Sequence, residues 1–219
     1  MKQYRVALTG ITPLIMHWDN IEWQDQMLAW RTVPENAKNS KAGDDRTPPY
    51  TWKGHTYNDG EVVVVPHDNL RSNLIAAGKK VKTGKGATTF KTAIASGISF
   101  DAAFVPLVLS NGKTVPWSDI EAIEGTFVDQ CEGARRLGFK LLAKRASVGQ
   151  NKHVRVRPVF DKGWSLSFAV TVTDDSLTQE VLQELFRVAG RYIALCDWRV
   201  GAPKSPGPYG QYTAEVETV

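Results

Sequence analysis

Apolar and polar residues alternate over several short stretches of the chain, the pattern of β-strands with one buried face. The first strand is predicted at residues 4–16, where Gly10 and Pro13 indicate a bend or bulge. The clearest signal is a β-hairpin formed by residues 138–148 and 152–160. In its second strand valines alternate with basic residues, so we expect the valines on one face and the cations on the other.

Other segments have helical spacing or the length of short strands. Helices are predicted at residues 21–30, 68–81 and 177–195. Asp68 and Ser176 are expected to be the N-caps of the second and the third. Residues 34–49 are polar and predict an exposed insertion, whereas residues 82–132 give no clear pattern apart from a possible strand at 103–109 and a turn at Asn111-Gly112. Further strands are expected at residues 61–66, 164–173 and 211–219.

Without the insertions, the order of elements is strand, helix, two strands, helix, strand. This order predicts an α+β fold, an elaborated ferredoxin-like (RNA-recognition-motif-like) antiparallel sheet with two helices and loop insertions. A length of 219 residues is enough for one buried core. We therefore expect a single domain over residues 1–219, with insertions at about 17–60 and 82–132.

Composition places the protein among ordinary globular chains. Hydrophobic residues make up 42% and charged residues 23%. There is no apolar run of the length that spans a membrane, and the first residues do not have the pattern of a signal peptide. Cys131 and Cys196 are expected to be free thiols, which predicts a cytoplasmic location.

The distribution of charge is more informative than the net charge of +4. Residues 70–100 contain six Lys or Arg and residues 133–160 contain eight, and neither stretch contains an acid. Segregation of this kind produces a locally positive field. It indicates a polyanionic partner, although two ordinary solvated surfaces would have the same sequence.

The predicted hairpin carries the strongest functional signal. Alternate residues of a strand lie about 6.6 Å apart, close to the spacing of phosphates in an extended single strand, and nearby aromatic rings can stack on bases. The candidate nucleic-acid-binding residues are Lys79, Lys80, Lys82, Lys85, Lys144, Arg145, Lys152, His153, Arg155, Arg157, Trp164 and Trp198.

Motifs for catalysis are weak by comparison. The Gly78–Gly86 segment has the wrong spacing for a phosphate-binding loop of nucleotide hydrolases, and the histidines and cysteines lack the spacing of a zinc site. Asp44-Asp45 is interpreted as a turn. No cofactor, metal or catalytic residue is predicted, and His17 stands alone as a possible general base.

Three segments carry a resemblance to known families: residues 10–17, residues 152–158, and Asp197-Trp198-Arg199 together with Pro206-Gly207-Pro208-Tyr209-Gly210. They resemble a group of uncharacterised phage and prophage proteins. The expected core, with a loop before the last strand, also resembles the RAMP superfamily, which includes the backbone subunits of CRISPR effector complexes. That resemblance implies binding of single-stranded RNA along a filament. In some RAMP relatives it implies an endoribonuclease with a catalytic histidine, for which His17 has the comparable place.

Three hypotheses remain open at this stage. The first is a non-enzymatic protein that binds single-stranded DNA or RNA and coats the strand as a homo-oligomer. The second is a metal-independent endoribonuclease that depends on His17. The third is an assembly protein whose basic faces bind acidic protein partners.

Overall fold

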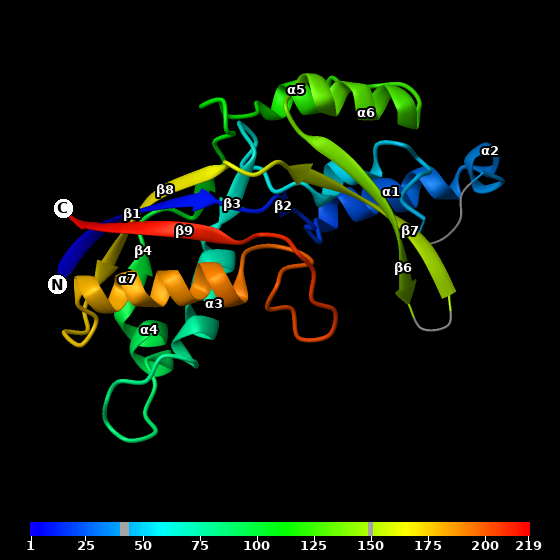
Figure 1. Cartoon of the computed structure of the whole chain (residues 1–219). Coiled ribbons are helices and arrows are strands. Elements are labelled where there is room, and N and C mark those ends of the chain that lie inside the picture. Colours follow the sequence, from blue (N-terminus) through cyan, green and yellow to red (C-terminus); the bar gives the residue numbers. More distant parts are fainter. Residues whose placement is uncertain (40–43, 149–150) are drawn as a thin grey trace. The chain divides into compact units, whose positions relative to one another are not determined.

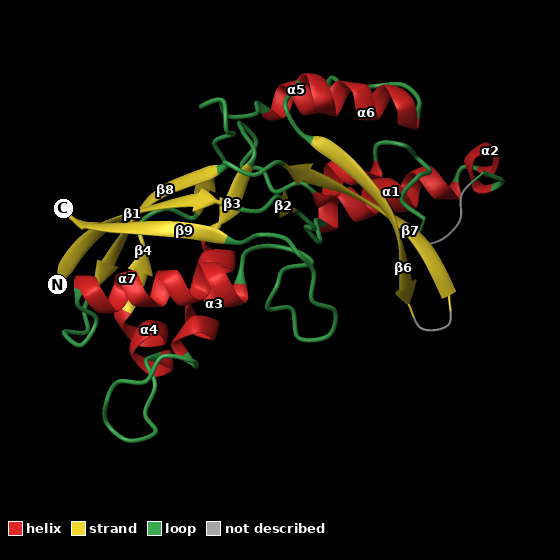
Figure 2. Ribbon diagram, in the orientation of Figure 1, coloured by secondary structure: helices red, strands yellow, loops and turns green. Residues whose placement is uncertain are grey.

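The computed structural model describes residues 1–39, 44–148 and 151–219, and it has an α+β fold with antiparallel strand pairs (Figures 1 and 2). Its internal contacts form two compact units. Unit 1 comprises Met1–Leu14, Val64–Thr114 and Asp161–Val219, and unit 2 comprises Ile15–Val63 and Val115–Phe160. The expected insertion at 17–60 lies within unit 2, but residues 82–114 belong to unit 1. Two compact units can still fold together, so the single domain stays a prediction.

Unit 1 is built on a sheet with the strand order β4-β8-β1-β9. Strand β1 pairs with both β8 and β9, and β4 pairs with β8. In β1 the buried Tyr4, Val6 and Leu8 alternate with more exposed residues, as the sequence pattern predicts. The strands are β1 (Lys2–Gly10), β4 (Ile98–Phe100), β8 (Ser165–Val172) and β9 (Tyr212–Thr218).

Helices α3 (His67–Gly78) and α7 (Gln179–Val188) contact the same face of this sheet (Figure 1). The rings of Phe168 in β8 and Phe186 in α7 lie 6.2 Å apart. The hydroxyl of Tyr212 in β9 donates to Oδ1 of Asn73 in α3 at 2.6 Å. Phe168 and Tyr212 belong to the buried set of their strands, so both helices cover the apolar side of the sheet.

The helix starting after residue 176 begins later than predicted. Thr178, not Ser176, is its N-cap, because the Thr178 side chain accepts from the backbone N–H of Val181. Ser176 instead donates to Asp174 in the preceding turn. The helix continues as a π-turn at Ala189–Ile193, which the periodicity did not reveal.

The opposite face of the sheet carries small and charged side chains. Arg5 lies opposite Ala169 on one side and Glu217 on the other, and Ala7 lies opposite Ser167 and Glu215. Bases that stack on a sheet need aromatic rings. This face therefore does not offer the stacking surface that an RNA-recognition-motif-like sheet implied.

The segment without a clear sequence pattern, residues 82–132, contains several short elements. In unit 1, β3 (Val64–Pro66) pairs with β5 (Phe104–Pro106), and α4 (Lys91–Gly97) precedes β4. The predicted turn at Asn111-Gly112 is confirmed, because Leu109 N–H donates to the carbonyl of Lys113 across it. In unit 2 the segment forms α5 (Trp117–Glu121) and α6 (Phe127–Arg136).

Unit 2 contains a sheet with the order β2-β7-β6. The predicted hairpin is confirmed: β6 (Lys140–Val148) pairs with β7 (Asn151–Phe160) from Lys140↔Val159 to Val148↔Asn151. The predicted first strand ends early, at Gly10, and resumes as β2 (Leu14–Ile15), so the expected interruption is also confirmed. Between β2 and α5, the helical segments of this unit are α1 (Ile21–Thr32), α2 (Pro34–Ala37) and the 3-10 turn η1 (Thr51–His55).

Aromatic residues fill the core of unit 2. The buried ring of Phe139 lies 5.6 Å from Trp52 and 5.2 Å from Phe160. Next to Trp52, the buried Lys53 donates from Nζ to the carbonyls of Glu121 and Ile123, at 2.9 and 2.7 Å. Burial lowers the pKa of Lys53. The lysine thus satisfies backbone acceptors that the end of α5 leaves without helical partners.

Candidate functional site

The β6–β7 hairpin presents its cations in two different environments. On β6, Lys144 and Arg145 are exposed, as expected for residues that contact a polyanion. Lys144 lies directly opposite Arg155 of β7, and Arg145 lies opposite Val154. His153, Arg155 and Arg157 on β7 are half-buried. Lys152 lies in β7, but its side chain is outside the part that the structure describes.

Arg155 is not the exposed strand-face cation that the alternating pattern predicted. Its Nη1 lies 3.1 Å from Oδ1 of Asp45, and only 27% of its side chain is exposed. The Asp44-Asp45 segment, expected to be part of an exposed insertion, is buried against β7 instead. The backbone N–H of Asp45 donates to the carbonyl of Val154 at 2.8 Å, which fixes the segment to the strand.

Asp45 is the centre of a buried polar cluster. Its carboxylate accepts from Nη1 of Arg155, from Nε2 of His55 at 3.2 Å, and from the backbone N–H of Val156 at 3.1 Å. Burial by itself would raise the pKa of Asp45. The His55 hydrogen bond, the charges of His55 and Arg155 and the Val156 N–H outweigh burial and lower that pKa. Asp45 is therefore ionised at neutral pH.

His55 faces a hydrogen-bond acceptor at each ring nitrogen. Nε2 faces the Asp45 carboxylate, and Nδ1 lies 3.3 Å from the carbonyl of Trp18. A carbonyl and an ionised carboxylate only accept, so each of these two hydrogen bonds needs a proton on the ring nitrogen that makes it. The ring of His17 lies edge-on against His55, with centroids 4.5 Å apart. The structure thus places His17, the lone candidate base, beside a second histidine.

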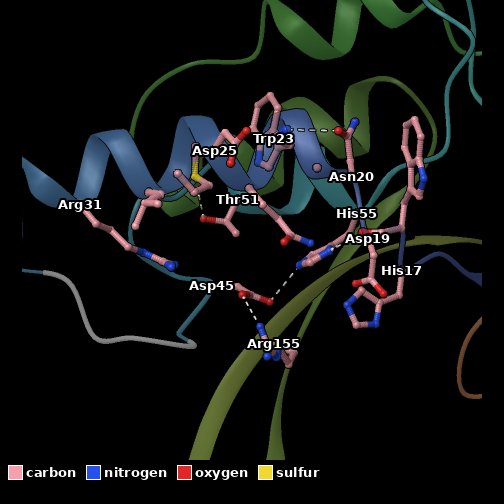
Figure 3. Close-up of a pocket in the computed structure, with 15 residues that line it drawn as sticks. His17, Asp19, Asn20, Trp23, Asp25, Arg31, Asp45, Thr51, His55 and Arg155 are labelled. Atoms are coloured by element: carbon pink, nitrogen blue, oxygen red, sulfur yellow. Dashed lines mark hydrogen bonds and ion pairs between the residues drawn. The ribbon is translucent and has the colours of Figure 1, made fainter.

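These residues line a cavity of about 550 Å³ that lies within unit 2 (Figure 3). Helix α1 forms one wall, with Trp23, Met27 and Arg31 lining it. The chain before α1 contributes His17 and Trp18. Asp45, Thr51, His55 and Arg155 line the cavity from the other elements. A volume of this size is typical of sites for small organic ligands.

The remaining predicted cations lie in unit 1. Lys79 and Lys80 follow the end of α3, and Lys82 and Lys85 lie in a turn closed by the Lys82↔Thr89 bridge. All four are exposed. They form a basic segment that is far from the hairpin in the sequence and belongs to the other compact unit.

Of the two tryptophans proposed to stack on bases, one is excluded by its burial. Trp164 is fully buried, and its indole N–H donates to the carbonyl of Thr12 at 2.9 Å. Its ring also covers Gly10, where a Cβ would come within 2.2 Å of it. Trp164 is therefore a core residue, and its assignment to the nucleic-acid site was wrong.

Trp198 remains partly accessible in the loop between the π-turn and β9. Its ring lies 5.5 Å from that of Tyr209, and the backbone of Gly207 passes close to it. Its φ of 45° is left-handed, as are those of Ala194 and Cys196. Left-handed backbone at residues other than glycine is found preferentially at functional positions.

Two comparisons with known proteins found no match: no protein-family model matches the chain, and no curated protein does.

Sequence reasoning missed Asp45, His55 and Arg31 as site residues. Asp45 and His55 are ten positions apart and Arg155 is far away in the sequence, so their convergence depends on the tertiary fold.

Within residues 1–39, 44–148 and 151–219, no group of three or more His, Cys, Asp or Glu side chains is arranged to hold a metal ion. Among the described residues, no helix is long and apolar enough to cross a membrane.

Proposed function

We propose that this protein binds single-stranded DNA or RNA through the β6–β7 hairpin, without covalent chemistry. The observation that carries the proposal is the hairpin itself: an extended basic ladder with exposed Lys144 and Arg145, within a stretch of the sequence that contains no acid. Phosphate oxygens bind cations spaced along such a surface, and the binding is driven by release of counterions.

The ion pair with Asp45 changes the role of Arg155 in this proposal. One carboxylate already compensates its charge, so Arg155 contributes less to the electrostatic attraction than an exposed cation would. Arg155 instead fixes the hairpin that presents Lys144 and Arg145. The exposed lysines from Lys79 to Lys85 offer a second basic segment, which is consistent with a protein that contacts a strand at more than one place.

We also propose that unit 1 has a ferredoxin-like core. The chain order β1, α3, β4, β8, α7, β9 and the strand order β4-β8-β1-β9 support this assignment. The distant resemblance to the RAMP superfamily has the same basis, and with it the hypothesis that copies of the chain coat a strand. Cooperative binding to long strands is the expected signature of coating.

Fluorescence anisotropy with labelled 20-nucleotide DNA and RNA strands at several salt concentrations tests binding. Each phosphate contact contributes about −0.7 to the slope of log K against log salt. Lys144→Gln with Arg145→Gln should reduce the steepness of that slope by about 1.4, because two contacts are lost. Lys113→Gln with Lys162→Gln removes the same charge from exposed turns and is the matched control. Equal effects of the two double variants, or a slope near zero, contradict the proposal.

A second candidate function is a metal-independent endoribonuclease, and the contact between His17 and His55 favours it. One imidazole would remove the proton of a 2′-hydroxyl, which attacks the adjacent phosphorus. The other would protonate the departing 5′-oxygen, which leaves a 2′,3′-cyclic phosphate. Incubating RNA with the protein in EDTA tests this. Cleavage abolished by His17→Ala but retained in His67→Ala, a half-exposed histidine of unit 1, supports it, whereas intact RNA contradicts it.

A further inference from the structure

Two buried hydrogen-bond donors in the cavity of unit 2 have no acceptor. They are Nε1 of Trp23 and Nε of Arg31, both on α1, and both side chains line the cavity (Figure 3). Buried polar atoms are almost always hydrogen-bonded, and a buried donor without a partner costs about 1–3 kcal/mol. Two such atoms in one cavity indicate that its surface is shaped for something other than the protein itself.

The chemistry of these donors restricts what they can bind. An indole N–H and a guanidinium N–H donate and never accept, so the partner must supply acceptor oxygens or nitrogens. Arg31 also carries a charge, and among the described residues it has neither a hydrogen bond nor an ion pair. Water satisfies a donor but leaves the charge uncompensated. Arg31 therefore favours an anion.

Asp45 does not serve as that anion. Its carboxylate already accepts from Arg155, from His55 and from the backbone of Val156. Figure 3 shows the Arg31 side chain extending from α1 toward the segment that carries Asp45. Asp19 and Asp25 also line the cavity, but within the described residues neither of them forms an ion pair with Arg31.

The cavity also has a flat apolar surface, because the indoles of Trp18 and Trp23 line it. Aromatic side chains stack on nucleobases with about 1–3 kcal/mol per base. The volume of about 550 Å³ accommodates a base, a ribose and a phosphate. Arg155 belongs both to the basic hairpin and to the cavity wall, so a strand that follows β7 passes the cavity.

We propose that this cavity binds one nucleotide, with the phosphate on Arg31 and the base against the indole of Trp23. A nucleotide supplies both the anionic oxygens for the guanidinium and a planar ring with acceptors for the indole N–H. The inference deepens the proposed nucleic-acid binding, because it assigns a nucleotide subsite next to the hairpin.

Titration of the intact protein with uridine and adenosine 5′-monophosphates, followed by tryptophan fluorescence, tests the inference. Saturable quenching is expected with the monophosphates, and much weaker binding with uridine, adenosine or inorganic phosphate alone. Arg31→Gln should weaken monophosphate binding by about tenfold to a hundredfold, the loss of one charge-assisted contact. Arg135→Gln removes an exposed arginine from the corresponding last turn of α6 and should leave the affinity unchanged.

A second measurement keeps the result independent of folding defects. In ¹H–¹⁵N spectra, the indole signal that is missing in Trp23→Phe identifies Trp23, and the monophosphate should shift it in the wild type. No saturable binding, equal binding of nucleosides, or an unmoved Trp23 signal overturns the inference. If monophosphates fail while oligonucleotides still bind through Lys144 and Arg145, the subsite is wrong and the proposed function stands. If monophosphates bind while oligonucleotides do not, the proposed function is wrong and the nucleotide subsite stands.

Discussion

Replacing Asp45 by asparagine removes the negative charge on which Arg155 and His55 converge, while it keeps the size of the side chain. The Asp45 side chain is 2% exposed, and its partners Arg155 and His55 are 27% and 13% exposed. The variant therefore leaves the Arg155 guanidinium without its carboxylate partner and with little access to water. We expect Asp45→Asn to destabilise the folded protein. The backbone hydrogen bond from Asp45 N–H to the carbonyl of Val154 does not involve the side chain and should remain.

The magnitude follows from the burial of the partners. Removing one member of a buried ion pair costs about 3–5 kcal/mol. Arg155 and His55 keep some exposure, and the amide oxygen of asparagine can still accept one bond, so the loss should lie near the lower end, about 3 kcal/mol. For a chain of this length each kcal/mol shifts Tm by about 2–4 °C, which gives a decrease of about 6–12 °C.

Urea unfolding monitored by tryptophan fluorescence measures the loss of unfolding free energy. Glu184→Gln is the matched control, because it removes one acidic charge from an ion pair with Arg187 whose members are 44% and 51% exposed. Exposed pairs of this kind contribute little, so this control should unfold like the wild type. An Asp45→Asn variant as stable as Glu184→Gln would refute the assignment of Asp45 as a structural anchor.

The same pair of proteins tests the pH dependence. The folded pKa of Asp45 lies below the ordinary value of 3.8, so the unfolded chain takes up the proton first as the pH falls. The stability that the Asp45 carboxylate contributes is complete above the unfolded pKa and is lost as the pH falls through the lower folded pKa. The stability difference between the wild type and Asp45→Asn should shrink below about pH 4. A difference that stays constant down to pH 2 contradicts the shift.

Three further predictions concern other residues. Arg155→Gln should be as destabilising as Asp45→Asn, and the double variant should cost less than the sum of the two, because both remove one interaction; a double-mutant cycle in urea measures the coupling, and additive losses would contradict it. Trp164→Phe removes the bond to Thr12 and should lower Tm while leaving oligonucleotide affinity unchanged, as separate thermal and anisotropy measurements can show. Burial raises the pKa of the Cys196 thiol to about 12, so a thiol-specific disulfide reagent at pH 8 should modify Cys131 first in the folded protein, which Cys131→Ser verifies.

The elements that the sequence predicted well are those with a strong local pattern. The hairpin of β6 and β7 has alternating residues and complementary length, and β1 has three buried apolar positions in strict alternation. Helix α1 was predicted within two residues of its observed end. Short elements such as α4 and α5 were missed because five to seven residues carry too little periodicity to separate helix from turn.

The candidate site was predictable only in part. The segregation of basic residues and the alternation located the basic hairpin, but they could not show that Arg155 faces a buried acid more than a hundred residues earlier in the chain. Asp44-Asp45 lies in a polar stretch rich in turn-forming residues, which suggests exposure. The burial of Trp164 was also beyond a local pattern, because its partner, the carbonyl of Thr12, belongs to the other end of the sequence.

The position of β1 in its sheet has a consequence for synthesis of the chain on the ribosome. Both neighbours of β1, β8 and β9, begin at Ser165 and Tyr212, so this central strand leaves the exit tunnel long before either partner exists. At about 5–20 residues per second, roughly 150 further residues take about 8–30 s to translate. During that interval the apolar side of β1 has no sheet to join. The segments of unit 2 emerge within the same interval, so the nascent chain can form the β6–β7 hairpin before β1 has a partner strand. A chaperone that binds the exposed apolar side of β1 would act during this interval.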